Sequence, residues 1–89
     1  MNETEFAERL KADGYTEIEM QNLEPRSGKG EHGHPFAIRG LVLAGTFIVT
    51  QDGHRTTYTA GQVFAVDQDH PHDESIGPEG ARVIVGRKF

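Results

Sequence analysis

The sequence has no cysteine and no tryptophan among its 89 residues. Without cysteine the chain can form no disulfide and can offer no thiolate to a metal. This absence excludes zinc fingers, iron–sulfur clusters and enzymes that use a cysteine nucleophile.

Basic residues and long apolar runs are also scarce. Nine Lys and Arg stand against fourteen Asp and Glu, which gives a formal net charge of −5 and argues against a nucleic-acid backbone as partner. No apolar run approaches the length of a membrane span, and the first residues (Met-Asn-Glu-Thr-Glu) lack the basic and apolar regions of a signal peptide. We therefore expect a cytoplasmic protein whose partner is a small-molecule ligand or substrate, with no membrane and no nucleic acid.

A chain this short has room for one core that is small relative to its surface. We expect a single domain over residues 1–89, with a helix over about 3–13 and a barrel over about 15–88. A bound metal or a second copy of the chain would add stability. The segment 15–23 is predicted to be an edge strand that pairs in a homodimer.

The N-terminal segment has helical spacing. Phe6 and Leu10 fall on one face, Thr4 is the expected N-cap, and Gly14 is placed to end the helix in a left-handed conformation. A lone helix of this length is unstable in water, so its apolar face must pack on the rest of the domain.

The remainder of the chain is typical of short β-strands. Branched and aromatic residues are dense in three segments, and turn signals separate them. The expected strands include 36–49, 63–66 and 81–86, and the expected turns are 52–53, 60–61 and 77–80. This spacing of strands and turns predicts an all-β sandwich or barrel.

Four of the five histidines lie in two His-x-His pairs, His32 with His34 and His70 with His72. Alternate residues of a strand share a face, so each pair can aim both imidazoles into one space. Neutral imidazole is the commonest protein ligand for divalent zinc, iron, nickel and copper. The pattern predicts one metal site with three or four nitrogen ligands. Surface histidines in loops beside Pro35 and Pro71 are the alternative interpretation.

Two motifs surround these histidines. The first comprises 28–35, which contains His32 and His34, followed by the strand 41–45 that ends in a glycine; the second opens with 59–64, has Gly61 eleven positions before His72, and has Pro71 just before that histidine. In these features residues 24–88 resemble a small single-domain cupin of the RmlC-like jelly-roll type. The resemblance implies an all-β double-stranded β-helix barrel, here with a short N-terminal helix.

The resemblance also implies a divalent transition metal held by His32, His34 and His72. Iron(II) is the first candidate, and zinc, nickel, manganese and copper are alternatives. His70 is a further candidate ligand, or a residue that orients one. The glutamate ligand of the family falls on Ile38, or with the other spacing on Arg39, and neither can bind a metal.

Three nitrogen ligands would leave up to three open positions on an octahedral ion, for water, oxygen or a chelating substrate. Without the glutamate the site would keep a charge near that of the ion, which favours anionic ligands. Asp69, Asp73 and Glu74 are candidates to orient an imidazole, with solvated loop carboxylates as the alternative. His54 follows a turn and is expected to be exposed.

Phe36, Ile38, Phe47 and Phe64 are expected to line a pocket, or else simply to fill the core. The interior is expected to be almost entirely apolar, and no general base can be named. Two functions therefore stay open: a dioxygenase-like metal enzyme acting on a small molecule, and a non-catalytic module that binds or senses a small ligand.

Overall fold

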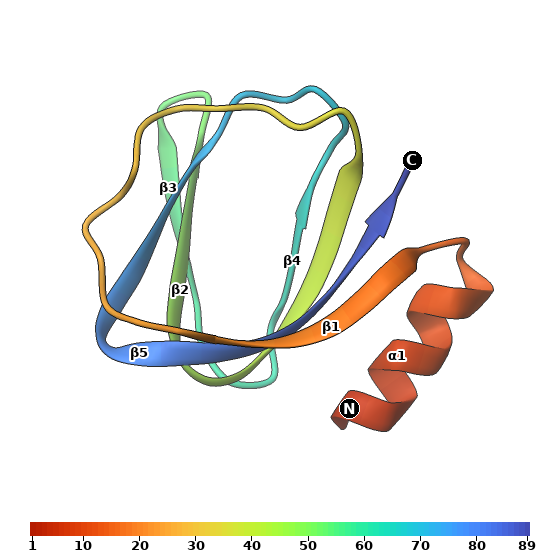
Figure 1. Ribbon diagram of the computed structural model, residues 1–89. Coiled ribbons are helices and arrows are strands. Elements are labelled where there is room, and N and C mark those ends of the chain that lie inside the picture. Colours follow the sequence, from red (N-terminus) through yellow and green to blue (C-terminus); the bar gives the residue numbers. More distant parts are fainter.

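The computed structural model describes residues 1–89 as an antiparallel β-barrel with one helix against its side (Figure 1). In chain order the elements are α1 (Glu3–Ala12), β1 (Thr16–Leu23), β2 (Ala37–Gln51), β3 (His54–Tyr58), β4 (Val63–Val66) and β5 (Asp73–Lys88). The prediction of an all-β fold with a short N-terminal helix is confirmed. The helix is not long or apolar enough to cross a membrane.

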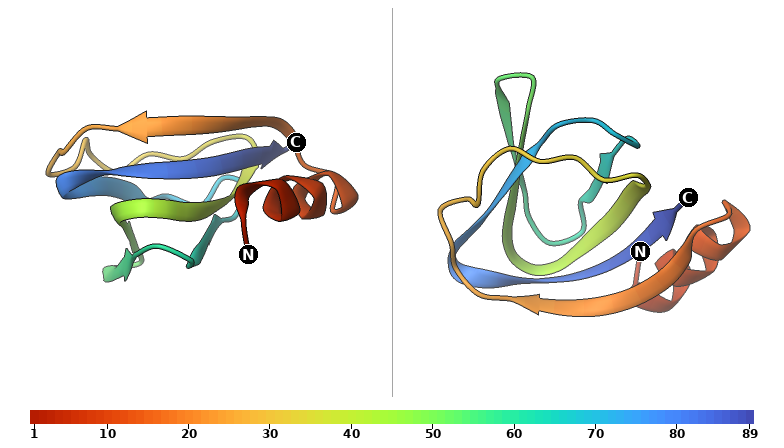
Figure 2. Two further views of the ribbon diagram at one scale, coloured as in Figure 1. Left: turned by 90° about the horizontal axis from the view of Figure 1, so that it is seen from below. Right: turned by 45° about the horizontal axis from the view of Figure 1, so that its top comes forward.

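Two long strands, β2 and β5, form the frame of the barrel. The strand order is β1-β5-β2-β3, and β4 pairs with β2 outside this path. The first part of β2 pairs with β4 and the end of β5, and its last part pairs with β3 and the start of β5. Both strands curve strongly along their length (Figure 2), so each contributes to two walls of the barrel.

The bend in β5 occurs where a turn was expected. Residues 77–80 belong to β5, which runs from Asp73 to Lys88, but they pair with neither β1 nor β2. Gly45 lies opposite Ala81 and Phe47 opposite Ile76, so two steps along β2 match five along β5. A Cβ at residue 45 would lie 2.0 Å from the carbonyl oxygen of Gly80, and both glycines have a φ of +77°. The predicted turn is therefore a bulge that bends a continuous strand.

The helix begins at Glu3, as expected, but its N-cap is not the predicted residue. The side chain of Asn2, not Thr4, caps it by accepting a hydrogen bond of 2.9 Å from the backbone N–H of Glu5. Gly14 follows the helix with a φ of +87°, which confirms its predicted left-handed conformation.

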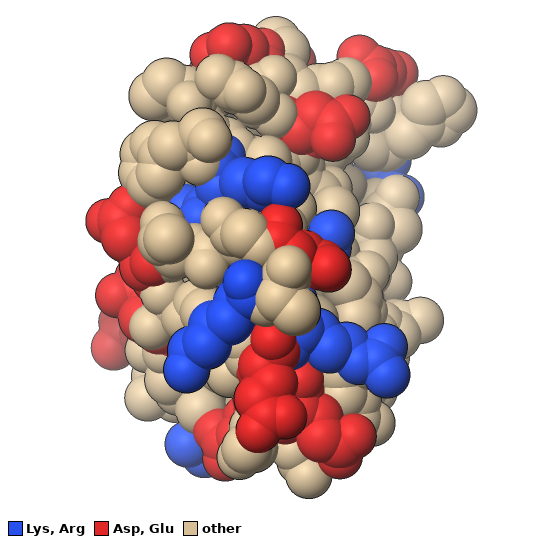
Figure 3. All heavy atoms as spheres, turned by 90° about the vertical axis from the view of Figure 1, so that its right-hand side faces the viewer, with Lys and Arg blue, Asp and Glu red and all other residues tan.

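The outer face of the helix is charged. Acidic Glu3 and Glu5 lie in its first turn and basic Arg9 and Lys11 in its last, which is the arrangement that the helix dipole favours. Figure 3 shows acidic and basic side chains interleaved across the side of the molecule that carries α1. This surface has no large area of one sign.

Alternation along β2 and β5 creates two separate cores. Leu41 and Ile84 face the helix, whereas Val42, Val83 and Val85 face the inside of the barrel. The buried residues beneath the helix are Phe6, Leu10, Tyr15, Leu41 and Ile84. The buried residues inside the barrel are Val42, Phe47, Val49, Phe64, Val66, Ile76, Ala81, Val83 and Val85.

Candidate metal centre

The long connection between β1 and β2 lies against the start of β5. His32 and His72 pair across an antiparallel bridge, with each backbone N–H donating to the other's carbonyl oxygen at 2.8 Å. This bridge holds two of the three predicted ligands opposite each other. His34 follows on the same side of the connection, with its ring 5.0 Å from that of His32 and 5.1 Å from that of His72.

Four side chains converge at this bridge. One ligand atom each from His32, His34, His72 and Glu74 lies within 4.8 Å of the others. Metal–nitrogen bonds of about 2.0–2.1 Å place the donor atoms of one ion roughly 3–4 Å apart. Side-chain adjustments of less than about 1 Å would bring these four atoms onto a single ion.

The ring orientations of two histidines are set by backbone carbonyls. Nδ1 of His32 lies 2.9 Å from the carbonyl oxygen of Gly30, and Nδ1 of His72 lies 3.0 Å from that of His70. A carbonyl can only accept, so each Nδ1 carries a hydrogen and donates it. In the neutral rings the lone pair is therefore on Nε2, which is the form that binds a metal.

Those two Nε2 atoms have no ordinary hydrogen-bond donor. Nε2 of His32 is buried without any partner, and Nε2 of the fully buried His72 lies 3.3 Å from Oε1 of Glu74. Leaving a buried acceptor unpaired costs about 1–3 kcal/mol. A divalent cation among these atoms would satisfy both nitrogens and the carboxylate together, so the donor set fits a metal.

His34 is also held toward its neutral form. Burial lowers its pKa, and the neighbouring imidazoles of His32 and His72 lower the pKa further because like charges repel. Its ring stacks on Phe36, with centroids 4.9 Å apart and planes 11° apart. A neutral ring in a fixed orientation is ready to act as a ligand.

Glu74 is the member of the cluster that sequence reasoning did not assign as a ligand. It follows His72 by two residues, and so shares its face at the start of β5. Its Oε2 accepts a hydrogen bond of 3.2 Å from Nη2 of Arg26, while Oε1 faces His72. The carboxylate of this site thus comes from β5, whereas the family pattern expected it from β2 at Ile38. The spacing of His72 and Glu74 was the available signal.

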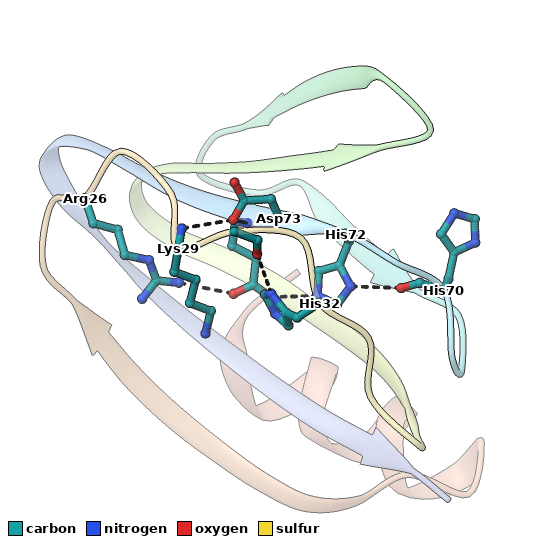
Figure 4. Close-up of polar contacts among 8 residues, drawn as sticks. Arg26, Lys29, His32, His70, His72 and Asp73 are labelled. Carbon is teal, nitrogen blue, oxygen red and sulfur yellow. Dashed lines mark hydrogen bonds and ion pairs between the residues drawn. The ribbon is translucent and has the colours of Figure 1, made fainter.

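The structure does not bring His70 to the cluster. Its Nε2 lies 3.0 Å from Oδ2 of Asp52, and only its backbone carbonyl touches the site, through His72. Figure 4 shows its ring apart from those of His32 and His72. His70 is thus not placed as a direct ligand, and it orients His72 through its backbone. His54 is exposed, as expected.

The two other carboxylates do not orient an imidazole through their side chains. Asp73 accepts hydrogen bonds from the backbone N–H groups of Lys29 and Glu74, which lower the pKa of its carboxyl group and fix the loop beside β5. Asp69 is exposed and adopts a left-handed φ of +60°, with its backbone N–H donating to the carbonyl of His34.

A cavity of about 190 Å³ adjoins the cluster, with His34 and Glu74 in its wall. All four predicted pocket residues, Phe36, Ile38, Phe47 and Phe64, line it. The remaining lining residues are Gln21, Leu23, Arg26, Lys29, Val83, Val85 and Arg87. The expectation of an almost entirely apolar interior is wrong, because the loop before β2 and the end of β5 bring three cationic side chains to this space.

The family model of the cupin domain matches residues 19–85. The chain therefore belongs to the cupin family, and the barrel and the histidine positions agree with that membership. No curated protein matches the sequence.

Solved structures with the same fold are distant in sequence. A protein of unknown function from Rhizobium leguminosarum matches with a TM-score of 0.72 and 18% identity, over 80% of this chain and 67% of that one. A cupin 2 conserved barrel domain protein from Salinispora arenicola matches at 0.68 and 20%, over 81% and 61%. The EutQ protein of Clostridium difficile matches at 0.71 and 16%, over 89% and 60%. The chain thus spans about two thirds or less of each of these proteins, and the likeness shows the fold alone.

Proposed function

We propose that this cupin holds one divalent transition metal through His32, His34, His72 and Glu74 and binds a small molecule at the positions that the protein leaves open. The observation that carries the proposal is the buried Nε2 of His32, which has no partner and lies in a cluster of acceptor atoms. Acceptors that converge without a donor are explained by a cation.

Four protein ligands would leave two positions on an octahedral ion. The cavity adjoins the cluster, since His34 and Glu74 belong to both, so a small molecule in the cavity would reach the ion that these residues would hold. Phe36, Ile38 and Phe64 give this space apolar walls. A small molecule with an oxygen or sulfur donor fits such a site.

The first candidate reaction is a metal-dependent oxygenation of the bound small molecule. Iron(II) held by nitrogen and carboxylate ligands supplies oxygen-activating chemistry. The protein's own part is to lower the pKa of His34 by burial, to fix the rings of His32 and His72 through the carbonyls of Gly30 and His70, and to hold Glu74 through Arg26.

A non-catalytic binding or sensing module is the second candidate, and one observation favours it. Apart from His34 and Glu74, the polar side chains of the cavity are Gln21, Arg26, Lys29 and Arg87. None of these is a base at neutral pH when unperturbed. Proton transfer by a dedicated side chain is therefore not built into the cavity, and binding alone needs none.

The test is elemental analysis of protein purified without an affinity tag, followed by oxygen uptake with the metal-loaded protein. We expect about one transition-metal ion per chain. Oxygen consumption that depends on both the metal and an added small molecule would support the oxygenase. Full metal loading without any consumption would favour the binding module, and protein that binds no metal after loading would refute the proposal.

A further inference from the structure

The cavity beside the cluster carries an excess of positive charge. Arg26, Lys29 and Arg87 line it, and Glu74 is the one carboxylate in its wall. The lining thus has a net charge of +2 before any metal is added. This is the opposite sign to the whole chain, whose formal charge is −5.

Arg26 is fixed in place and has an unused donor. Its backbone pairs with Ile76 through hydrogen bonds of 3.2 and 2.8 Å, and its Nη2 donates to Glu74. Its Nε is buried and has no hydrogen-bond partner. A buried charged donor that lacks an acceptor is costly unless a ligand supplies one.

Lys29 lines the cavity together with Arg26 and is itself exposed. Its backbone N–H is held by Asp73 at 3.0 Å, while its ammonium group forms no ion pair within the chain. Figure 4 shows the side chains of Arg26 and Lys29 extending in the same direction from the connection between β1 and β2. Two cations with free donors in the wall of one cavity form a site for an anionic group.

The rest of the cavity is apolar and small. Phe36, Ile38, Phe47 and Phe64 lie along its wall, and Arg87 covers the ring of Phe36 with its guanidinium carbon 5.4 Å from the centroid. A volume of about 190 Å³ corresponds to roughly six to ten non-hydrogen atoms, given about 30 Å³ for each water molecule in the liquid. This is below the usual size of a site for a drug-like molecule.

We propose that the ligand of this protein is a small carboxylate with an apolar body, of roughly six to ten non-hydrogen atoms. Its carboxylate lies at Nε of Arg26 and the ammonium of Lys29, and its apolar body lies along Phe36, Ile38 and Phe64. The inference deepens the proposed function and rests on it: His34 and Glu74 line the same cavity, so an oxygen or sulfur donor carried on the apolar body would reach the metal. The carboxylate subsite can be probed by itself with a ligand that lacks this second donor.

The test is isothermal titration of zinc-loaded and metal-free protein with hexanoate and with hexanamide, a neutral molecule of nearly the same shape. We expect hexanoate to bind more tightly by roughly tenfold to a hundredfold, the range for hydrogen bonds to charged groups. Lys29→Met should remove most of this difference. Lys11→Met, an exposed lysine of α1, is the matched control and should leave it unchanged.

Equal binding of hexanoate and hexanamide, or no binding of either, would overturn the inference. So would inorganic phosphate that binds as tightly as hexanoate, because the apolar wall would then contribute nothing. The zinc content of the loaded protein tests the proposed metal site separately from the ligand. Full zinc content without carboxylate preference would refute only the ligand, and absent zinc would refute the metal site.

Discussion

The two cores of this domain are built from the same strands but serve different ends. Beneath α1, Leu10 and Leu41 are almost completely buried, at 0% and 1% exposure, and the helix closes that face. On the other face of β2 and β5 the barrel stays partly hollow and holds a cavity and four polar ligand groups. Alternation along a strand thus gives one face a core closed by the helix and the other a core that shares its space with the candidate site.

The largest effect should come from the helix-covered core. Leu10→Ala is expected to lower the free energy of unfolding by about 2–5 kcal/mol, because it leaves a cavity where a fully buried side chain was. Urea denaturation would measure this change. The folded fraction should still bind one metal ion per chain, since no ligand belongs to that core.

Leu10→Met is the control for this variant, because it keeps the volume and should cost less than about 1.5 kcal/mol. If Leu10→Ala also lost its metal while folded, the helix-covered core and the candidate site would be coupled.

The second prediction concerns the metal ligands on the barrel side of the sheet. His32→Ala or His72→Ala should weaken metal binding by more than about 100-fold, because loss of a ligand costs more than loss of the group that orients it. His54→Ala changes an exposed histidine and should retain full metal content. Elemental analysis of the three variants checks this prediction, and equal metal content in all three would refute the site.

A third change moves the carboxylate from one strand to another. Ile38→Glu should destabilise the metal-free protein by about 1–3 kcal/mol, because it removes the packing of a half-buried side chain on the barrel core and takes a carboxylate partly out of water. Added metal should raise the melting temperature of this variant more than that of the wild type. In Glu74→Gln, adding Ile38→Glu should restore part of the lost affinity.

The thermal melts with and without added metal provide the measurement. If Ile38→Glu gains no more from metal than the wild type does, Ile38 does not face the ion. The carboxylate would then be fixed to β5.

Arg26 should have a smaller effect, since it touches the ligand Glu74 and not the ion. Arg26→Met is expected to reduce metal affinity by about 10- to 100-fold, as for other groups that orient a ligand. A metal-competition titration would measure this loss. Arg55→Met replaces an exposed arginine of β3 and should change nothing.

The smallest effect concerns the open edge of the sheet. β1 is an edge strand, and we expect it to pair with a second copy of the chain along residues 19–23, beyond the irregular register between Thr16 and Glu19. Sedimentation at micromolar concentration should give twice the chain mass of 9.8 kDa. A mass of one chain would refute the dimer and leave both cores as described.

Local sequence signals predicted well those elements that depend on neighbours in the chain. Phe6 and Leu10 marked the helix, and residues 52–53 form the expected tight turn, with φ values of +52° and +77°. The expected turn at 77–80 is instead a bulge within one strand. These residues pair with neither neighbouring strand, and Gly80 keeps a positive φ, while pairing with β2 resumes on either side at Ile76 and Ala81.

The candidate site was predictable in part for the same reason. His32, His34 and His72 follow motif spacing, and the structure brings them together. Glu74 was harder to assign, because the polar run 67–74 conceals the point at which β5 begins. The contribution of Arg26 and Lys29 depends on how the connection between β1 and β2 lies over the barrel, and no periodicity in the sequence records that path.

The bridge between His32 and His72 has a thermodynamic consequence. An ion bound to both side chains would cross-link positions about forty residues apart in a chain that has no disulfide. By the chain-entropy relation, closing a loop of that length lowers the entropy of the unfolded state by the equivalent of about 4 kcal/mol at 25 °C, provided that the link persists on unfolding. A metal dissociates when the chain unfolds, so its contribution to the free energy of unfolding depends instead on the concentration of free metal. The metal would thus act as a reversible cross-link between the two segments. A chelator could remove it, whereas a disulfide would stay closed without a reductant.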